Sequence, residues 1–243
     1  MVTKMVTAPT RTVGRNVTSS CCGSGSPLEW LLEGNRLHAK LALHRDPKAF
    51  EGLTRGQSPI AALVGCVDAR TPIDQVTGTK AGTLLISRNV ANQADAAVAA
   101  MVQFGLDPLR IRHFVVCGHQ DCGGIKYAMK LAVTSDKGHS DELTRWLAPL
   151  KDLYAMHRSA LEGLSESERV EQFAILNIRT QVQRLAESPV IRIFHTRFPD
   201  PITIQGWYLR LSTGQFEVVA NQVVTTAQSQ KDILTDAPLD RHL

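Results

Sequence analysis

Three residues of types that bind metals stand at two places in this chain. Cys66 follows a short apolar run, and His119 and Cys122 lie three positions apart in a Gly-rich segment. A His and a Cys at that spacing can point at one ion from a tight loop, and Cys66 can reach the same ion from an adjacent strand. Two thiolates and one imidazole suit zinc, which prefers tetrahedral nitrogen and sulfur ligands. We therefore predict a site for one Zn²⁺ per subunit, held by Cys66, His119 and Cys122.

Three protein ligands would leave a fourth coordination position open for water, which is the pattern of catalytic rather than structural zinc. Bound zinc pulls the pKa of water from ~15.7 towards ~7, so that hydroxide is available at ordinary pH. Each signal alone is weak, because a single Cys at a strand end is usually part of the core. A purely structural zinc would want a fourth Cys or His nearby. Asp68 could fill that position in a closed, inactive state.

The elements that must position these residues are short strands alternating with helices. Apolar runs predict buried strands at residues 60–64, 84–86 and 114–117. Helical patterns lie between and after them, at residues 93–104, 124–132, 141–157 and 167–186, and two further strands are expected at 202–204 and 216–219, with turn residues between them at 212–214. This alternation predicts an α/β fold with a mostly parallel central β-sheet flanked by helices on both faces. The ligands then follow the carboxyl ends of strands, where open α/β sheets bind ligands.

The chain begins with two different kinds of sequence. Residues 1–25 are basic, rich in hydroxyl groups and free of acidic residues, which predicts a flexible tail, with an organellar transit peptide as the alternative. Ser26 and Glu29 form a capping box with Pro27 at the first helical position. A Leu-rich helical arm is expected from there to about Asp46-Pro47. We predict a single catalytic domain over residues 26–243.

Composition excludes several classes of protein. The 243 residues are 43% hydrophobic and 21% charged, with a net charge of +4, which is ordinary for a globular protein. No dense basic stripe indicates nucleic-acid binding. No apolar run approaches the roughly 18 residues of a membrane span, so membrane insertion is not expected. Five cysteines are too few for a disulfide scaffold, which favours a reducing, cytoplasmic location, or an organelle if the tail is a transit peptide.

Two motifs together resemble the paired signatures of the β-carbonic anhydrases. They are Cys66-Val67-Asp68-Ala69-Arg70 and Gly118-His119-x-x-Cys122-Gly123-Gly124. Other landmarks of that family appear in the same order along the chain: Gln57-Ser58-Pro59, Arg88-Asn89-Val90-Ala91-Asn92, Asn177-Ile178 and Gly206-Trp207. The resemblance covers roughly residues 26–220 and is specific, because it does not rest on one motif alone.

The resemblance implies a zinc-dependent enzyme that reversibly hydrates carbon dioxide to bicarbonate and a proton by means of zinc-bound hydroxide. It makes Asp68 and Arg70 the catalytic dyad, in which Arg70 holds the carboxylate off the zinc. It places Gln57, acting across a dimer interface, and the backbone N–H of Gly123 at the substrate, within an apolar wall of Leu85, Val90 and Phe104. It also implies a homodimer or a dimer-based tetramer.

The sequence departs from some members of this family at two positions, and it leaves two alternative functions open. Some bacterial members are regulated by bicarbonate at a site built from a Trp, a Tyr and an Arg. Here the first two positions are Leu63 and Leu209, although Arg88 remains, so we expect that regulation to be absent or altered. Carbonyl sulfide or carbon disulfide hydrolases resemble this family and share its ligands. A zinc-binding homologue without turnover is the other alternative.

Overall fold

The computed structural model describes residues 26–134 and 141–226, so the predicted tail at 1–25 lies outside the described residues. The chain divides after Gly56 into two compact units, and each is described by itself. None of the described helices is long and apolar enough to cross a bilayer.

The first unit contains the predicted N-terminal helix. Helix α1 spans Pro27–Arg45, and its first turn is closed by the predicted capping box. The Ser26 N–H donates to Glu29 Oε2 at 2.6 Å, and the Glu29 N–H donates to Ser26 Oγ at 3.3 Å. No residue of α1 is buried. A short 3₁₀ helix, η1, follows at Glu51–Arg55.

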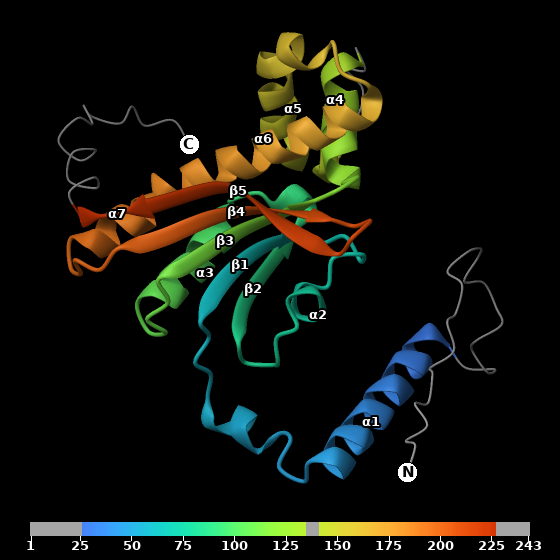
Figure 1. The fold of residues 1–243 in the computed structure, drawn as a ribbon, viewed down its shortest axis with the longest axis vertical. Helices are drawn as coiled ribbons and strands as arrows, with labels where there is room; N and C mark the ends of the chain where they lie inside the picture. Colours follow the sequence, from blue (N-terminus) through green and yellow to red (C-terminus); the bar gives the residue numbers. More distant parts are fainter. Residues whose placement is uncertain (1–25, 135–140, 227–243) are drawn as a thin grey trace, which may run out of the picture. The chain divides into compact units, whose positions relative to one another are not determined.

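The second unit is built on a five-stranded sheet with the order β2-β1-β3-β4-β5 (Figure 1). Its first four strands are parallel, and β5 pairs with β4 antiparallel. This confirms the predicted mostly parallel sheet. The strands are β1 (Ala61–Cys66), β2 (Leu84–Asn89), β3 (His113–His119), β4 (Ile202–Arg210) and β5 (Gln215–Val224).

All of the helices predicted in this unit are present, with ends shifted by a few residues. They are α3 (Ala96–Leu106), α4 (Gly123–Val133), α5 (Glu142–Leu161) and α6 (Glu166–Ala186). Three short elements were not predicted: α2 (Ile73–Thr77), the 3₁₀ turn η2 (Val90–Asn92) and α7 (Pro189–His195). The predicted third strand also extends further than its apolar run, so that His119 is its last residue rather than part of the following loop.

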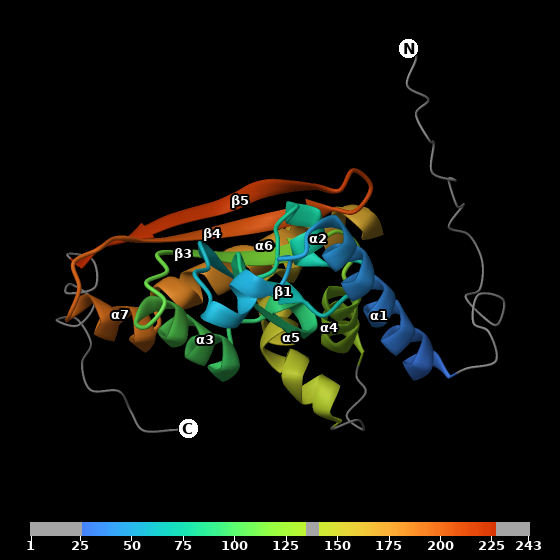
Figure 2. The same ribbon diagram turned by 90° about the horizontal axis from the view of Figure 1, so that it is seen from below.

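The two faces of the sheet are covered unequally, which qualifies the expectation of helices on both faces. The main core lies between one face and helices α3 to α7, and Figure 2 shows α3, α5 and α7 on the same side of the sheet. The other face holds a small cluster of Leu63, Ile73, Val115 and Cys117, to which α2 contributes. Right-handed crossovers explain this, because the chain moves from β1 to β2 in one direction and back past β1 to β3 in the other.

The same reversal creates the place where a ligand is expected. Strand β1 lies between β2 and β3, so the strand order changes direction at the β1–β3 pair, where Gly65 is in register with Cys117. In open α/β sheets a crevice forms beyond the carboxyl ends of the strands at such a point. Cys66 and His119 are the last residues of these two strands.

Candidate metal centre

The structure brings the three predicted metal ligands together. Cys66 ends β1, His119 ends β3, and Cys122 is the N-cap of α4. All three are buried, and one ligand atom from each lies within 4.8 Å of the others. The two sulfur atoms are 3.8 Å apart. This is the geometry that one ion of tetrahedral preference needs from three of its ligands.

His119 is oriented for a partner that the described protein does not supply. Its Nδ1 lies 3.0 Å from the backbone oxygen of Gln120. If Nδ1 carries the proton for that bond, the lone pair of Nε2 is available, as is usual for metal-binding histidines. Nε2 is buried and has no hydrogen-bond partner among the described residues. Because buried polar atoms nearly always have a partner, this atom fits a metal ion.

The thiols of Cys66 and Cys122 shift each other's pKa. The Cys122 side chain, acting as a hydrogen-bond donor, lowers the pKa of Cys66 to about 4, although burial opposes the shift. The backbone N–H groups of Asp68 and Ala91 lower it further. The pKa of Cys122 is raised, first by this same bond to Cys66 and then by burial. Because zinc binds thiolates, an ion held by this pair would displace its thiol protons.

A carboxylate stands beside this cluster and is held by an arginine. Arg70 Nε donates to Asp68 Oδ1 at 2.9 Å, and its NH2 group donates to Oδ2 at 2.7 Å. These bonds keep the pKa of Asp68 well below its ordinary value. Asp68 Oδ2 also lies 3.8 Å from His119 Nε2. The predicted pairing of Asp68 with Arg70 is thus present, and the lowered pKa favours the ionised carboxylate beside the three candidate ligands.

Arg88 fixes the loop that carries the dyad. Its Nε donates to the backbone oxygen of Cys66 at 2.8 Å, and its NH2 group donates to that of Asp68 at 2.6 Å. The sequence motif included Arg88, but no local sequence pattern indicated these hydrogen bonds.

The two positions at which Leu stands in place of the Trp and Tyr of the regulated bacterial enzymes, Leu63 and Leu209, are both buried apolar side chains. That regulation by bicarbonate is absent or altered stays a prediction.

The turn η2 forms another wall of the cluster and was missed from the sequence. Ala91 and Asn92 have left-handed backbone conformations, with φ of 62° and 47°. Gly124 lies directly against this turn. A Cβ there would be 2.9 Å from Val90 Cγ1 and 3.1 Å from Ala91 Cβ, so only glycine allows α4 to approach so closely. Asn92 was one available signal, because Asn adopts the left-handed region more readily than most residues.

The residues predicted to bind substrate are less buried than the three candidate metal ligands. Gln57 is exposed before β1, and Gly123 is exposed at the start of α4, where a Cβ would meet no atom within 4 Å. Leu85 and Val90 are half-buried against the main core. Phe104 is 47% exposed on α3 and is not part of that core. The roles of these five residues in substrate binding stay predictions.

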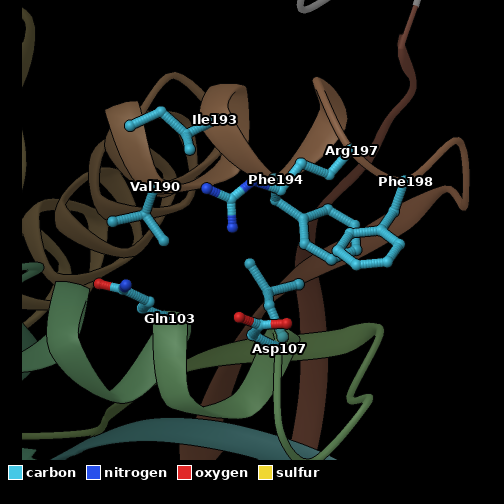
Figure 3. A pocket seen from close by; sticks show the side chains of 8 residues that line it. Gln103, Asp107, Val190, Ile193, Phe194, Arg197 and Phe198 are labelled. Atoms are coloured by element: carbon cyan, nitrogen blue, oxygen red, sulfur yellow. The ribbon is translucent and has the colours of Figure 1, made fainter.

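A separate groove lies between α3 and α7 (Figure 3). Most of the side chains that line it are apolar: Leu106, Val190, Ile193, Phe194 and Phe198. The polar ones are Gln103, Asp107 and Arg197. Because α3 and α7 lead into β3 and β4, this groove lies near the amino ends of those strands.

Among the described residues, the one cluster of His, Cys or acidic side chains able to hold a metal is that of Cys66, His119 and Cys122.

Comparison with known proteins gives one consistent result. The family model described as carbonic anhydrase matches residues 61–216. A carbonic anhydrase of Emericella nidulans is 29% identical over 188 residues, which are 76% of this chain and 79% of that protein. A carbonic anhydrase of Candida albicans is also 29% identical, over 202 residues, which are 81% of this chain and 69% of that protein.

Solved structures agree with the sequence relatives. One of two tetrameric β-carbonic anhydrases from Sordaria macrospora superposes with a TM-score of 0.72 at 28% identity, covering 80% of this chain and 98% of that one. A β-carbonic anhydrase of Aspergillus fumigatus gives 0.73 at 26% identity, covering 86% and 98%. The family model, these relatives and the paired motifs at the carboxyl edge of the sheet lead to one conclusion: the chain belongs to the β-carbonic anhydrase family.

Proposed function

We propose that this protein is a zinc-dependent enzyme that reversibly hydrates carbon dioxide to bicarbonate and a proton. The observation that carries the proposal is the buried group of Cys66, His119 and Cys122, whose unpartnered Nε2 lies beside the carboxylate of Asp68. Membership in the carbonic anhydrase family supports the reaction. The donor set of two sulfur atoms and one nitrogen supports zinc.

The three ligands would hold the ion through Cys66 Sγ, Cys122 Sγ and His119 Nε2. Zinc bound there supplies a Lewis acid that lowers the pKa of a water molecule far enough for hydroxide to be available near neutral pH. Asp68 remains a carboxylate because Arg70 donates to both of its oxygens. Each carboxylate oxygen has further lone pairs, so Asp68 can accept a hydrogen bond from the attacking oxygen and orient it.

Substrate binding is proposed to use neutral groups, because carbon dioxide has no charge and no donors. Gly123 is the first residue of α4, and N–H groups in the first turn of a helix have no partner within the helix. No atom lies within 4 Å of the place where a Cβ would stand at Gly123, so the start of α4 is open on that side. Leu85, Val90 and Phe104 are the proposed apolar wall, and Gln57 the proposed donor from across a subunit interface.

The protein is also proposed to assemble as a dimer or a dimer-based tetramer. Helix α1 exposes seven large apolar side chains in the described structure: Leu28, Trp30, Leu31, Leu32, Leu37, Leu41 and Leu43. Burial of such a set in a second copy would remove considerable apolar surface from water. The related Sordaria enzymes are described as tetrameric. A monomeric mass by light scattering at micromolar protein would contradict this assembly.

The reaction is tested by stopped-flow measurement of carbon dioxide hydration at pH ~8.5, where the metal-bound water should be ionised. Zinc-loaded protein is expected to be active, and Cys66→Ala to have no activity above the buffer rate. Cys117→Ala is the matched control, since Cys117 is equally buried but does not belong to the ligand group. Zinc-loaded protein without hydration would contradict the proposal. It would favour a sulfur-containing analogue of carbon dioxide as substrate, or a role without turnover.

A further inference from the structure

The turn η2 is strained and adjoins the ligand group. It follows directly after Asn89, which is in register with Cys66 on the neighbouring strand. Ala91 and Asn92 are consecutive non-glycine residues in the left-handed region, and each such residue costs on the order of 1 kcal/mol or more. A conformation of that kind persists only where the surroundings hold it.

Hydrogen bonds from two distant helices hold this turn. Asn177 on α6 donates its Nδ2–H to the backbone oxygen of Ala91 at 3.0 Å. Trp146 on α5 donates its Nε1–H to the backbone oxygen of Val90 at 2.8 Å. Gln181, one turn after Asn177, donates to Asn177 Oδ1 at 2.8 Å and so fixes the orientation of that amide. Asn177 and Gln181 are both fully buried, so water does not compete for these bonds.

The same turn bonds to one sulfur ligand and packs against the start of the helix that bonds to the other. The backbone N–H of Ala91 donates to the sulfur of Cys66, while its carbonyl is the acceptor of Asn177. Val90 and Ala91 also pack against Gly124. The N–H groups of Gly124 and Ile125, in turn, donate to the sulfur of Cys122. Ala91 is therefore fixed at its carbonyl by α6 and directed at its N–H toward a metal ligand.

We infer that Asn177 and Trp146 are positioning residues for the metal centre, which fix the Val90–Asn92 turn so that the Ala91 N–H points at Cys66. This inference rests on the proposed function, because it concerns the protein with its metal. A hydrogen bond to a thiolate withdraws electron density from the sulfur. Weakening it makes the sulfur a stronger donor to the ion and leaves the ligand less well oriented. Outer partners of this kind typically change metal affinity by roughly 10- to 100-fold.

The alternative is that Asn177 and Trp146 only stabilise the fold. A readout at the sulfur atoms separates the two roles, because loss of stability alone would not change the electronic state of a thiolate–metal bond. Cobalt(II) bound in place of zinc provides that readout, since thiolate-to-cobalt charge-transfer absorption reports the electron donation of the sulfur ligands. The variants are Trp146→Phe, which keeps an aromatic ring but removes the donor, and Asn177→Leu. Thr180→Val is the matched control, since Thr180 bonds only within α6.

In the full-length protein, both variants are expected to shift the charge-transfer band to longer wavelength. Both should also weaken zinc binding by ~10- to 100-fold in competition with a chelator. Thr180→Val should match the wild type. If Asn177→Leu fails to fold, Trp146→Phe decides alone. Bands and zinc affinities equal to those of the wild type, even with lowered melting temperatures, would overturn the inference. Wild-type protein that shows the cobalt band but does not hydrate carbon dioxide would contradict the proposed function and not this inference.

Discussion

Cys66 and Cys117 lie on adjacent parallel strands, and both are 5% exposed, yet their thiols differ. Cys117 points into the small cluster with Leu63, Ile73 and Val115, and burial raises its pKa to about 12. Cys66 lies 3.8 Å from the sulfur of Cys122, which is the main reason why its pKa is lowered to about 4 despite burial. Two equally buried thiols on neighbouring strands therefore have pKa values shifted in opposite directions, according to the groups beside them.

Position along the strand contributes to this difference between the two thiols. Cys117 lies inside β3, where the neighbouring backbone N–H groups are used in the sheet. Cys66 is the last residue of β1, where the chain leaves the sheet, and the N–H groups of Asp68 and Ala91 can turn toward its sulfur. The carboxyl edge of the sheet thus supplies donors that its interior cannot.

The largest expected effect comes from changing each cysteine in turn. Cys66→Ser should lower zinc affinity by more than the roughly 100-fold attributed to outer partners, because it removes a ligand itself. Cys117→Ala should leave the zinc content unchanged and cost about 1 kcal/mol in the free energy of unfolding, near the value of one buried methylene. Metal analysis after dialysis and urea unfolding measure the two quantities. Equal zinc loss in both variants would remove the distinction between the two thiols.

A smaller effect is expected from the glycines that begin α4. Gly124→Ala places a Cβ within 2.9 Å of Val90 Cγ1, whereas at Gly123 the same Cβ meets nothing within 4 Å. We expect Gly124→Ala to be less stable than Gly123→Ala by about 1–3 kcal/mol, the usual cost of overpacking. Both variants gain the same helix propensity, so their difference in urea unfolding isolates the clash. Equal stabilities would show that η2 yields easily, which would weaken its role in directing the Ala91 N–H.

The smallest expected effect concerns pH. The pKa of Asp68 is depressed in the folded state, so its contribution to stability is present above the unfolded value of about 3.9 and is lost as pH falls below it. Asp68→Asn should therefore flatten the acid dependence of the free energy of unfolding in zinc-free protein. Because Arg70 is 49% exposed, we expect a change of about 1 kcal/mol or less. An unchanged acid limb, measured by urea unfolding between pH ~2 and ~6, would contradict the ionised pair.

Much of the fold could be predicted because its strands begin as apolar runs and its long helices have clear periodicity. Strand β4 continues six residues past its predicted end at Ile204, since it goes on alternating buried and half-buried residues beyond the apolar run. Helix α7 was missed although Ser188 and Pro189 repeat the Ser-Pro start seen at Ser26 and Pro27. Seven residues are too few for a periodic pattern to become visible.

The candidate site also has a part that could be predicted and a part that could not. The three candidate ligands and the Asp68–Arg70 pair lie in two short motifs, so residue types and spacing were enough to predict that they come together, while their roles stay predictions. The hydrogen bonds from Trp146 and Asn177 join residues 56 and 86 positions apart. Such pairings depend on how α5 and α6 pack, which no local pattern contains. In η2, Asn92 is of a type that favours the left-handed region, but nothing local marks Ala91, whose carbonyl is held by the distant Asn177.

The strand order also has a consequence for the newly made chain. Strand β1 occupies the interior of the sheet, but both of its neighbours come later in the sequence. Translation at about 5–20 residues per second puts roughly 3–10 s between the synthesis of Cys66 and that of His119. During this interval an apolar strand with two open edges has incomplete pairing, which favours association with other chains. The strand that ends at Cys66 thus waits for both of its partner strands while the chain is still being synthesised.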